Sequence, residues 1–368
     1  MSRRLSELTT LRLGGPAQRL VEARDEASIV AAVREADAAG EPLLVLAGGS
    51  NVIVADEGFP GTVVRVLSTG VEPTGHGRVR VQAGEPWDPF VAACVERGVA
   101  GVECLSGIPG SVGATPIQNV GAYGQDVAET IAAVRIHDRR EDVTVDLGPE
   151  DCGFAYRSSR FKREPGRWVV LSVSFALHPG ELSTPIGYAE LARRLGVEIG
   201  ERAPLADVRE AVLDLRRGKG MVIDPADPDS VSAGSFFTNP ILDPEAFAAL
   251  QERAGERPPS WPEPDGRVKT SAAWLIERAG FTRGYGDPER IAISSKHTLA
   301  LTNRGAGTAA GLVALASEIA AGVRKRLGVQ LVPEPVLVGL SLDELAPEPV
   351  DVAGPEDEDD VAAAHARR

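Results

Sequence analysis

Two glycine-rich stretches contain the residue types best suited to hold a charged cofactor. The first, at residues 46–52, reads Leu-Ala-Gly-Gly-Ser-Asn-Val and follows an apolar run. Paired glycines let backbone N–H groups approach an anion, and serine and asparagine side chains can add hydrogen bonds. Taken alone, such a turn is more typical of an ordinary hairpin or strand–turn, and it matches neither the dinucleotide-binding nor the Walker pattern.

The second stretch, residues 107–124, is more distinctive. It has five glycines and two prolines in eighteen residues, so it predicts a long irregular loop. Long loops of this kind inside a compact domain are usually functional, and here hydrogen-bonding side chains accompany the glycines. The candidate cofactor-binding residues of both stretches are Gly48, Gly49, Ser50, Asn51, Gly110, Ser111, Gly113, Thr115, Gln118, Asn119, Gly121, Tyr123 and Gly124.

Three further motifs follow along the chain: Tyr-Arg-Ser-Ser-Arg-Phe-Lys at 156–162, Ala-Gly-Ser-Phe-Phe-Thr-Asn-Pro at 233–240, and Pro-Glu-Pro at 333–335. With the glycine-rich stretches, they resemble, in the same order, the motifs of the UDP-N-acetylenolpyruvoylglucosamine reductase family. The resemblance runs from about Thr10 to Gly339. Any one motif would be weak, whereas five in order over this length are specific. Tyr188 and the long insertion at 178–218 resemble the type I subgroup, which has a tyrosine-bearing loop over the substrate.

The resemblance implies an α+β chain with a vanillyl-alcohol-oxidase/PCMH-like FAD-binding domain and a C-terminal α+β substrate-binding domain. It also implies a flavin-dependent oxidoreductase of peptidoglycan synthesis. The expected reaction is the NADPH-dependent reduction of the enolpyruvyl ether of UDP-N-acetylglucosamine to UDP-N-acetylmuramate. The partners implied are NADPH and UDP-N-acetylglucosamine enolpyruvate. The glycine-rich loops have no histidine or cysteine for attachment, so we expect noncovalent FAD.

Site residues follow from the resemblance by position. The residues that match the family's catalytic positions are Arg157, Ser235 and Glu334. Those that match contacts with the UDP-sugar are Tyr188, Lys219 and Asn239. Lys219 also follows a helix end beside Arg216 and Arg217, which favours a role in binding the diphosphate over a role in chemistry.

These side chains suit the implied reaction. No side chain carries hydride, so a flavin is needed and the protein supplies orientation and charge. Arg157 could hold the substrate carboxylate through a bidentate contact and stabilise the enolate-like charge. Ser235 would give a proton to the adjacent carbon. Glu334 would either polarise the intermediate or assist proton movement, and the sequence does not choose between these roles.

Each residue also has an ordinary interpretation. Arg157 could be a surface ion-pair residue, Ser235 a strand-end hydroxyl and Glu334 a solvated loop acid; their occurrence with the flavin loops favours catalysis. His297 is the best-placed histidine, but a lone histidine is more often structural. None of the five histidines has metal-ligand spacing, so we expect no metal.

Two alternatives keep part of this interpretation. One is an FAD oxidase of a small alcohol or hydroxy acid, which would not need Ser235 and Glu334 as they are placed. The other is a flavin- or UDP-sugar-binding module without turnover. A degenerate binder would be expected to lose its proton donor while keeping the glycine loops, and Ser235 is present.

Composition narrows the class of protein. The chain has 368 residues, 43% hydrophobic and 25% charged, which predicts two or three folded domains and excludes a wholly disordered or collagen-like chain. A net charge of −14 argues against nonspecific nucleic-acid binding. Three sparse cysteines, no apolar leader and no membrane-length apolar run indicate a cytoplasmic chain without membrane insertion. We expect a monomer.

The pattern of elements gives the domain organisation. In the first half, Asp25 should cap a helix that ends at Gly40, strands are expected at 43–46, 78–83, 131–137 and 168–177, and a helix at 90–95. Leu205, Val208, Val212 and Leu215 predict a helix that ends at Gly218. After residue 220 we expect strand, helix, helix, strand, helix, strand, with the longest helix near 312–327; the resemblance to the family is weaker around residues 255–270.

These patterns give three regions. An FAD-binding region spans 1–220, with residues 335–343 packed back onto it, and a substrate-binding domain spans 221–334. The tail, 344–368, has eight acidic residues and two arginines, and we expect it to be disordered.

Overall fold

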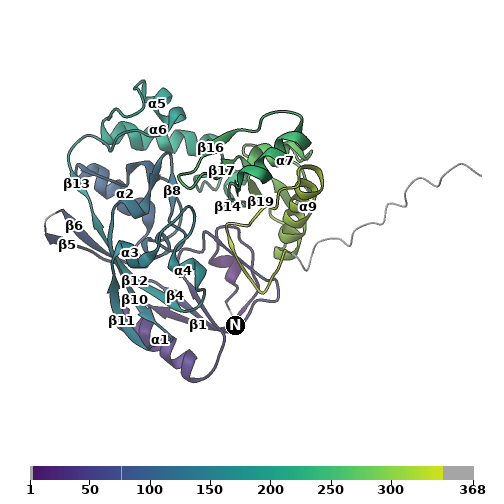
Figure 1. The fold of residues 1–368 in the computed structure, drawn as a ribbon. Helices are drawn as coiled ribbons and strands as arrows, with labels where there is room; N and C mark the ends of the chain where they lie inside the picture. Colours follow the sequence, from purple (N-terminus) through teal and green to yellow (C-terminus); the bar gives the residue numbers. More distant parts are fainter. Residues whose placement is uncertain (1–2, 76, 343–368) are drawn as a thin grey trace, which may run out of the picture.

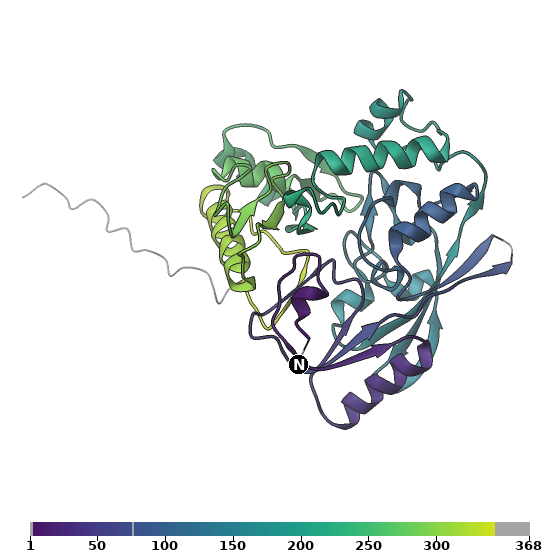
Figure 2. The ribbon, with the colours of Figure 1, turned by 180° about the vertical axis from the view of Figure 1, so that it is seen from behind.

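The computed structural model describes residues 3–75 and 77–342 (Figure 1). The predicted acidic tail lies outside these residues. Two parts are seen in both ribbon views: one contains the sheets formed before residue 180, and the other contains the C-terminal helices and their short strands (Figure 2). Within the described residues, no helix is both long and apolar enough to cross a membrane.

The chain begins with a small parallel sheet in the order β1-β4-β2. Its elements are β1 (Ala17–Ala23), α1 (Glu26–Ala38), β2 (Leu43–Leu46) and β4 (Phe59–Val66), and the 3-10 turn η1 (Leu5–Glu7) precedes them. The predicted cap is confirmed, because the carboxylate of Asp25 accepts the Ser28 N–H at 2.7 Å. The buried face of α1 includes Ile29, Val33 and Ala36, as the sequence predicts.

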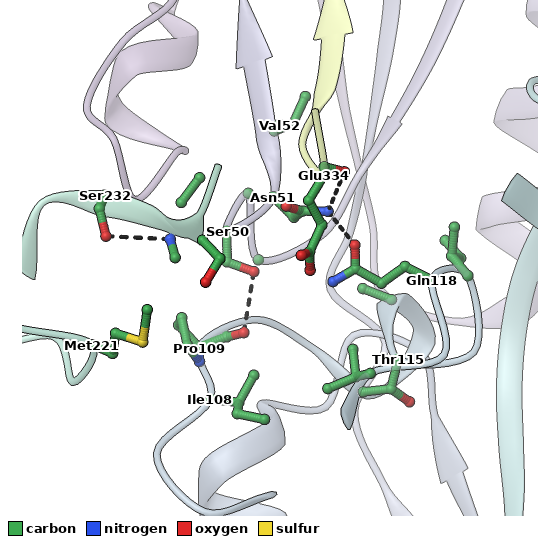
Figure 3. Close-up of a pocket in the computed structure, with 18 of the residues that line it drawn as sticks. Ser50, Asn51, Val52, Ile108, Pro109, Thr115, Gln118, Met221, Ser232 and Glu334 are labelled. Carbon is green, nitrogen blue, oxygen red and sulfur yellow. Dashed lines mark hydrogen bonds between the residues drawn. The ribbon is translucent and has the colours of Figure 1, made fainter. Parts of the chain in front are cut away.

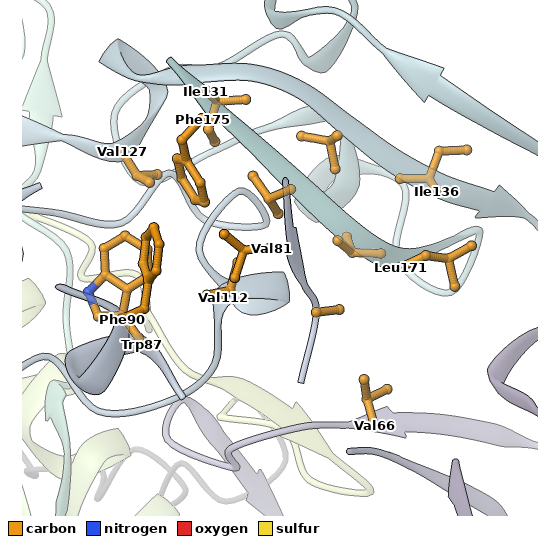
Figure 4. Close-up of a cluster of buried hydrophobic side chains, with 14 of the residues drawn as sticks. Val66, Val81, Trp87, Phe90, Val112, Val127, Ile131, Ile136, Leu171 and Phe175 are labelled. Atoms are coloured by element: carbon orange, nitrogen blue, oxygen red, sulfur yellow. The ribbon is translucent and has the colours of Figure 1, made fainter. Parts of the chain in front are cut away.

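A five-stranded antiparallel sheet forms the centre of the first part, in the order β11-β10-β12-β6-β5. Its strands are β5 (Val71–Gly75), β6 (Arg78–Gln82), β10 (Ile131–Asp138), β11 (Val143–Leu147) and β12 (Trp168–Ala176). Helix α2 (Trp87–Glu96) begins three residues before the predicted start. Trp87 and Phe90 of α2 pack against Phe175 of β12 with ring centroids 6.0 and 5.4 Å apart (Figure 4).

Short elements connect this sheet to the rest of the chain. The strand pairs are β3 (Val52–Val54) with β20 (Val336–Val338), β7 (Val99–Ala100) with β13 (His178–Pro179), and β8 (Gly121–Ala122) with β9 (Gln125–Asp126). The helices are α3 (Pro149–Cys152), α4 (Arg160–Arg163), α5 (Ala189–Leu195) and α6 (Leu205–Gly218), and the 3-10 turns are η2 (Glu103–Leu105), η3 (Val112–Ala114), η4 (Val127–Glu129) and η5 (Pro228–Ser230). Because β20 pairs with β3, the Pro-Glu-Pro motif lies beside the first glycine turn.

The C-terminal part has two three-stranded antiparallel sheets. Its elements are β14 (Ser232–Ser235), β15 (Ile241–Leu242), α7 (Pro244–Ala254), β16 (Ser260–Pro262), β17 (Val268–Thr270), α8 (Ala272–Arg278), β18 (Ile291–Ile293), β19 (Ala300–Asn303) and α9 (Ala309–Leu327). The predicted element order is incomplete: it has one strand before α7, none between α7 and α8 and one between α8 and α9, whereas the structure has two strands in each of these places. Strands of two to four residues are too short to show a period of two. Two of them, β16 and β17, lie in the segment 255–270, where the resemblance to the family is weaker.

Candidate active site

A cavity of about 490 Å³ lies between the two parts of the chain (Figure 3). Its lining comes from both glycine-rich loops, from α4 and the loop before it, from the end of α6, from β14 and from the Pro-Glu-Pro segment. All three predicted catalytic residues and two of the three predicted substrate-binding residues line this one cavity. Apolar walls with few polar groups are typical of ligand-binding clefts.

The first glycine turn is packed too closely for any side chain at its two glycines. A Cβ on Gly49 would lie 2.0 Å from the Leu8 carbonyl oxygen, and one on Gly48 would lie 2.6 Å from Cα of Gly110. Gly49 also has a φ of 59°, in the left-handed region. The two glycine loops therefore touch backbone to backbone, and without Cβ atoms the turn at 48–51 can bring its N–H groups close to a ligand.

Side chains link the two loops. The Ser50 hydroxyl donates to the Pro109 carbonyl at 3.1 Å, and Nδ2 of Asn51 donates to Oε1 of Gln118 at 2.5 Å (Figure 3). Nδ2 of Asn51 also lies 3.4 Å from the carbonyl oxygen of Glu334. Asn51 thus ties the cofactor loops to the segment that contains a predicted catalytic residue.

The site has unused hydrogen-bonding capacity that fits FAD. The hydroxyl of Ser111 is buried, and within the described residues it has no hydrogen-bond partner. A buried polar group without a hydrogen-bond partner lowers the stability of the folded protein, so in native proteins such a group usually binds a water or a ligand. This hydroxyl and the glycine turns line one cavity. The residues present therefore fit a cofactor with a diphosphate.

Four of the predicted cofactor residues shape the loop without lining the cavity: Gly110, Gly113, Asn119 and Gly124. A Cβ on Gly113 would lie 2.5 Å from Cβ of Ala83, and one on Gly124 would lie 3.0 Å from the Gly187 carbonyl carbon. Asn119 is buried, and its amide donates to the Ala155 carbonyl and accepts the Ala128 N–H. These residues fix the path of the loop.

Arg157 is held in an unusual backbone conformation, with a φ of 50°. Strained backbone of this kind persists only where surrounding contacts impose it. Its guanidinium donates to the carbonyl oxygens of Asn119 and Gly121 and lies 3.3 Å from the Asp126 carboxylate. Arg157 is therefore fixed in place before any ligand binds.

Glu334 lies beside two cations, with about 15% of its side chain exposed. Nε of Arg157 lies 3.9 Å from Oε1 of Glu334. Burial raises the pKa of Glu334, while the charges of Arg157 and Lys162 act in the opposite direction. Desolvation likewise lowers the pKa of Lys162. The cavity thus has a carboxyl group whose proton affinity depends on its neighbours, as is common at functional sites.

Lys162 was not assigned a role from the sequence, although it ends the Tyr156–Lys162 motif. It lines the cavity, and its ammonium donates to the Arg157 carbonyl oxygen at 3.2 Å. Its place near Glu334 depends on contacts between segments more than 170 residues apart in the chain. The only signal in the sequence is its presence in the motif.

Ser235 ends β14 on the same side of the cavity as the Pro-Glu-Pro segment. The Glu334 N–H donates to the Phe236 carbonyl at 2.8 Å, so the two predicted catalytic residues come from adjacent backbone segments. Gly234 before it has a φ of 74°. Within the described chain the Ser235 hydroxyl makes no hydrogen bond to protein, so it is available to a ligand.

Tyr188 and Lys219 lie together at one side of the cavity. The ring of Tyr188 stacks edge-on against Tyr123, with centroids 5.5 Å apart, and is 40% exposed. The Lys219 ammonium lies 5.6 Å from the Tyr123 ring centroid and 2.9 Å from the Glu190 carboxylate. Asn239 does not line the cavity; its Oδ1 accepts the Ala272 N–H at the start of α8.

His297 also lines the cavity, although the sequence favoured a structural role for it. Burial lowers its pKa to about 4, and the charges of Lys219 and Arg283 add to this effect. Glu277 and Glu190 act in the opposite direction, so burial is the main reason that this imidazole stays neutral.

The low pKa of His297 predicts acid sensitivity. In the unfolded chain histidine titrates near ~6.5, so below that pH the unfolded state binds the proton more readily than the folded state. Stability should therefore be full above pH ~6.5 and fall as the pH drops, by up to about 2 kcal/mol at pH ~5. Thermal unfolding from pH 7.5 to 5 should show a decline that is reduced in His297→Gln; equal declines in both proteins would contradict this assignment.

Comparison with known sequences finds similar proteins that have the same name. Residues 225–338 match the family model described as UDP-N-acetylenolpyruvoylglucosamine reductase, C-terminal domain, and residues 17–145 match the model of an FAD binding domain. The UDP-N-acetylenolpyruvoylglucosamine reductase of Thermobifida fusca is 58% identical over 348 residues, covering 92% of this chain and 97% of that protein. The enzyme of the same name from Streptomyces coelicolor is 58% identical over 346 residues, covering 92% and 90%.

A solved structure supports the fold. The crystal structure of UDP-N-acetylenolpyruvylglucosamine reductase (MurB) from Thermus caldophilus superposes with a TM-score of 0.63 at 24% identity. The match covers 92% of this chain and 98% of that one. The predicted combination of an FAD-binding domain and a second α+β domain is confirmed.

Proposed function

The chain belongs to the family of UDP-N-acetylenolpyruvoylglucosamine reductases, and from that premise we propose how its own residues carry out the reaction. It is an FAD-containing oxidoreductase of peptidoglycan precursor synthesis that reduces the enolpyruvyl ether of UDP-N-acetylglucosamine to UDP-N-acetylmuramate. The observation that carries the residue assignment is that Arg157, Ser235 and Glu334 line one cavity with both glycine-rich loops.

FAD, when bound, supplies the two-electron chemistry by accepting hydride from NADPH and passing it to the enolpyruvyl group. The residues proposed to hold it are the turn at 48–51 and the loop at 107–124. Their contribution is backbone N–H groups at close-packed glycines and the unsatisfied hydroxyl of Ser111. No histidine or cysteine lies in these loops, which supports noncovalent binding.

Arg157 is proposed to bind the carboxylate of the enolpyruvyl group. Its guanidinium is held by two carbonyls and by Asp126, so it needs little reorganisation when negative charge grows on the substrate. Glu334 lies 3.9 Å from it and limits how far the guanidinium can move. The Lys162 ammonium donates a hydrogen bond to the Arg157 carbonyl. We propose Lys162 as a positioning residue for Arg157 and Glu334.

Ser235 is proposed as the proton donor to the carbon next to the carboxylate. Its hydroxyl has no protein partner among the described residues, and the glycine before it leaves one side uncovered. A hydroxyl is a weak acid, but an enolate-like species is a strong base, so the transfer can run downhill. Removing such a donor typically costs about 2.7–4 kcal/mol of barrier.

The UDP-sugar is proposed to bind at Tyr188 and Lys219; Asn239, the third predicted contact, lies outside the cavity lining and accepts the Ala272 N–H at the start of α8. We further propose a chain that acts as a monomer, with an FAD-binding region at 1–220, to which residues 335–343 return, and a substrate-binding domain at 221–334. The pairing of β20 with β3 supports that return. Analytical ultracentrifugation of the holoprotein, which measures its molar mass in solution, would test whether it is a monomer.

Lys219→Ala should raise the Michaelis constant for the UDP-sugar about 10- to 100-fold while turnover changes little. The lysine would contact the diphosphate equally in the ground and transition states, and the loss of such uniform binding appears in the Michaelis constant. Initial rates at saturating NADPH measure both constants. A collapse of turnover at unchanged affinity would reject this role.

Glu190→Gln is the matched variant for the same site. Its carboxylate pairs with Lys219 at 2.9 Å, so a diphosphate has to compete with it. Removing the charge frees the ammonium and should lower the Michaelis constant for the sugar, opposite in sign to Lys219→Ala. An increase in Glu190→Gln would mean that the glutamate binds substrate itself.

The reaction itself is tested in steady state. Purified protein with NADPH and UDP-N-acetylglucosamine enolpyruvate should oxidise one NADPH for each UDP-N-acetylmuramate formed, measured by absorbance and mass spectrometry. UDP-N-acetylglucosamine, which lacks the enolpyruvyl group, should not support this oxidation. Equal NADPH consumption with both sugars would point to an oxidase that passes its electrons to oxygen.

A further inference from the structure

Arg216 is a buried cation without a counter-ion in the described structure. It lies in the last turn of α6 and is 8% exposed. Its Nη2 donates to the Met221 carbonyl at 2.8 Å, whereas its buried Nε has no hydrogen-bond partner among the described residues. Burial lowers the pKa of this guanidinium, which reflects the cost of keeping the charge away from water.

Asp88, the carboxylate whose charge acts on Arg216, is already engaged. The Asp88 carboxylate accepts hydrogen bonds from both terminal nitrogens of Arg209, at 2.7 and 2.9 Å, and from the Gly107 N–H at 2.6 Å. Among residues 3–75 and 77–342, no carboxylate lies within 4.0 Å of Arg216, the limit for an ion pair. Buried charges in proteins are normally paired, so this position is expected to receive an anion from outside the chain.

The surroundings of Arg216 indicate which anion. It lines the cavity, and a Cβ on Gly107 would lie 3.3 Å from its Nε. Gly107 begins the second glycine-rich loop, and this loop also contains Ser111, whose buried hydroxyl lacks a partner. Two unsatisfied donors, one of them cationic, therefore lie along the same loop and line the same cavity.

We propose that Arg216 is the counter-ion of the diphosphate of bound FAD. This rests on the proposed function only in that FAD occupies the cavity. A guanidinium matches the oxygens of a diphosphate through paired hydrogen bonds. The UDP-sugar has the same group, but its proposed contact is Lys219, whereas Arg216 packs on the glycine loop.

The test uses Arg216→Met apoprotein, prepared by removing FAD from the purified enzyme. Fluorescence titration should give an FAD dissociation constant about 10- to 100-fold above wild type, the range for losing a charged hydrogen bond. The melting temperature of the apoprotein should stay level or rise by about 2 °C, because methionine removes an unpaired buried charge. Arg216→Lys should recover part of the FAD affinity.

Arg217→Met is the matched control on the same helical turn. Its guanidinium pairs at the surface with Glu210 and Asp214, at 2.9 and 3.1 Å, so neither FAD affinity nor apoprotein melting should change by much.

Two results would overturn the proposal. If Arg216 only supports the end of α6 through the Met221 carbonyl, Arg216→Met lowers the apoprotein melting temperature and the FAD affinity together. If Arg216 binds the UDP-sugar, FAD affinity stays at the wild-type value and the holoprotein loses affinity for UDP. Failure of the proposed reaction would be seen separately, as wild-type holoprotein that binds FAD but forms no UDP-N-acetylmuramate.

Discussion

Ser235→Ala should separate the two halves of the reaction, with the half that uses NADPH nearly unchanged and the half that uses the sugar slowed about 10²- to 10³-fold. Hydride transfer from NADPH requires no proton delivery to the enolpyruvyl carbon, so it does not need this hydroxyl. The sugar half does, because the enolate-like charge must be protonated. Stopped-flow absorbance of the flavin band measures each half separately.

The control for Ser235→Ala is Ser232→Ala, in the same strand. The hydroxyl of Ser232 accepts the Gly234 N–H and lines the same cavity, so it reports on general disturbance of β14. A folding defect would slow both halves and loosen FAD. Ser235→Cys should recover part of the second half, because a thiol is a better acid. Normal sugar-dependent reoxidation in Ser235→Ala would remove Ser235 from the mechanism.

Arg157→Met is the second change with a large expected effect, again about 10²- to 10³-fold in the sugar half-reaction. The guanidinium would bind the carboxylate on which charge grows, so turnover should fall more than the Michaelis constant rises. Arg157→Lys should recover little, because one ammonium cannot reproduce the paired contact. Single-turnover kinetics with NADPH-reduced protein measures the effect.

Arg160→Met is the matched control for Arg157. It lies in the same motif, is about 40% exposed at its side chain and pairs loosely with Glu164 at 3.8 Å, so its loss should have little effect. Because Arg157 also holds the Asn119 and Gly121 carbonyls, melting temperatures are compared in parallel. A rate loss that tracks instability rather than the guanidinium would contradict the catalytic role.

The local features of the site could be predicted from the sequence because their signals are local. The turn at 48–51 follows a strand, and its glycines predict the close backbone approach that the structure shows at Gly48 and Gly49. The α1 cap at Asp25 and the buried face of α6 follow from residue type and helical spacing. These depend on neighbours within a few residues.

What depends on distant contacts could not be predicted from pattern alone. Glu334 reaches Arg157 because β20 pairs with β3 and the Glu334 N–H bonds to the Phe236 carbonyl. No periodicity encodes such a meeting, and only the family resemblance pointed to it. Only three of the seven strands that the structure describes after residue 220 are expected from the sequence, because each of these strands has only two to four residues.

In the sequence Arg216 is one of several basic residues near Lys219, and its spacing distinguishes it from the others. It lies four residues after Val212, on the buried face of α6. A charge on the apolar face of a helix has to meet a partner. Which partner it meets depends on the glycine loop at 107, more than 100 residues earlier, and that contact required the structure.

The most direct measurement follows the flavin colour of the purified protein under anaerobic conditions. NADPH should bleach the yellow protein, and UDP-N-acetylglucosamine enolpyruvate should then restore the colour while UDP-N-acetylmuramate forms in an amount equal to the FAD present. UDP-N-acetylglucosamine should not restore it. Protein that is colourless and takes up no FAD, or that stays bleached when the enolpyruvyl sugar is added, would contradict the account.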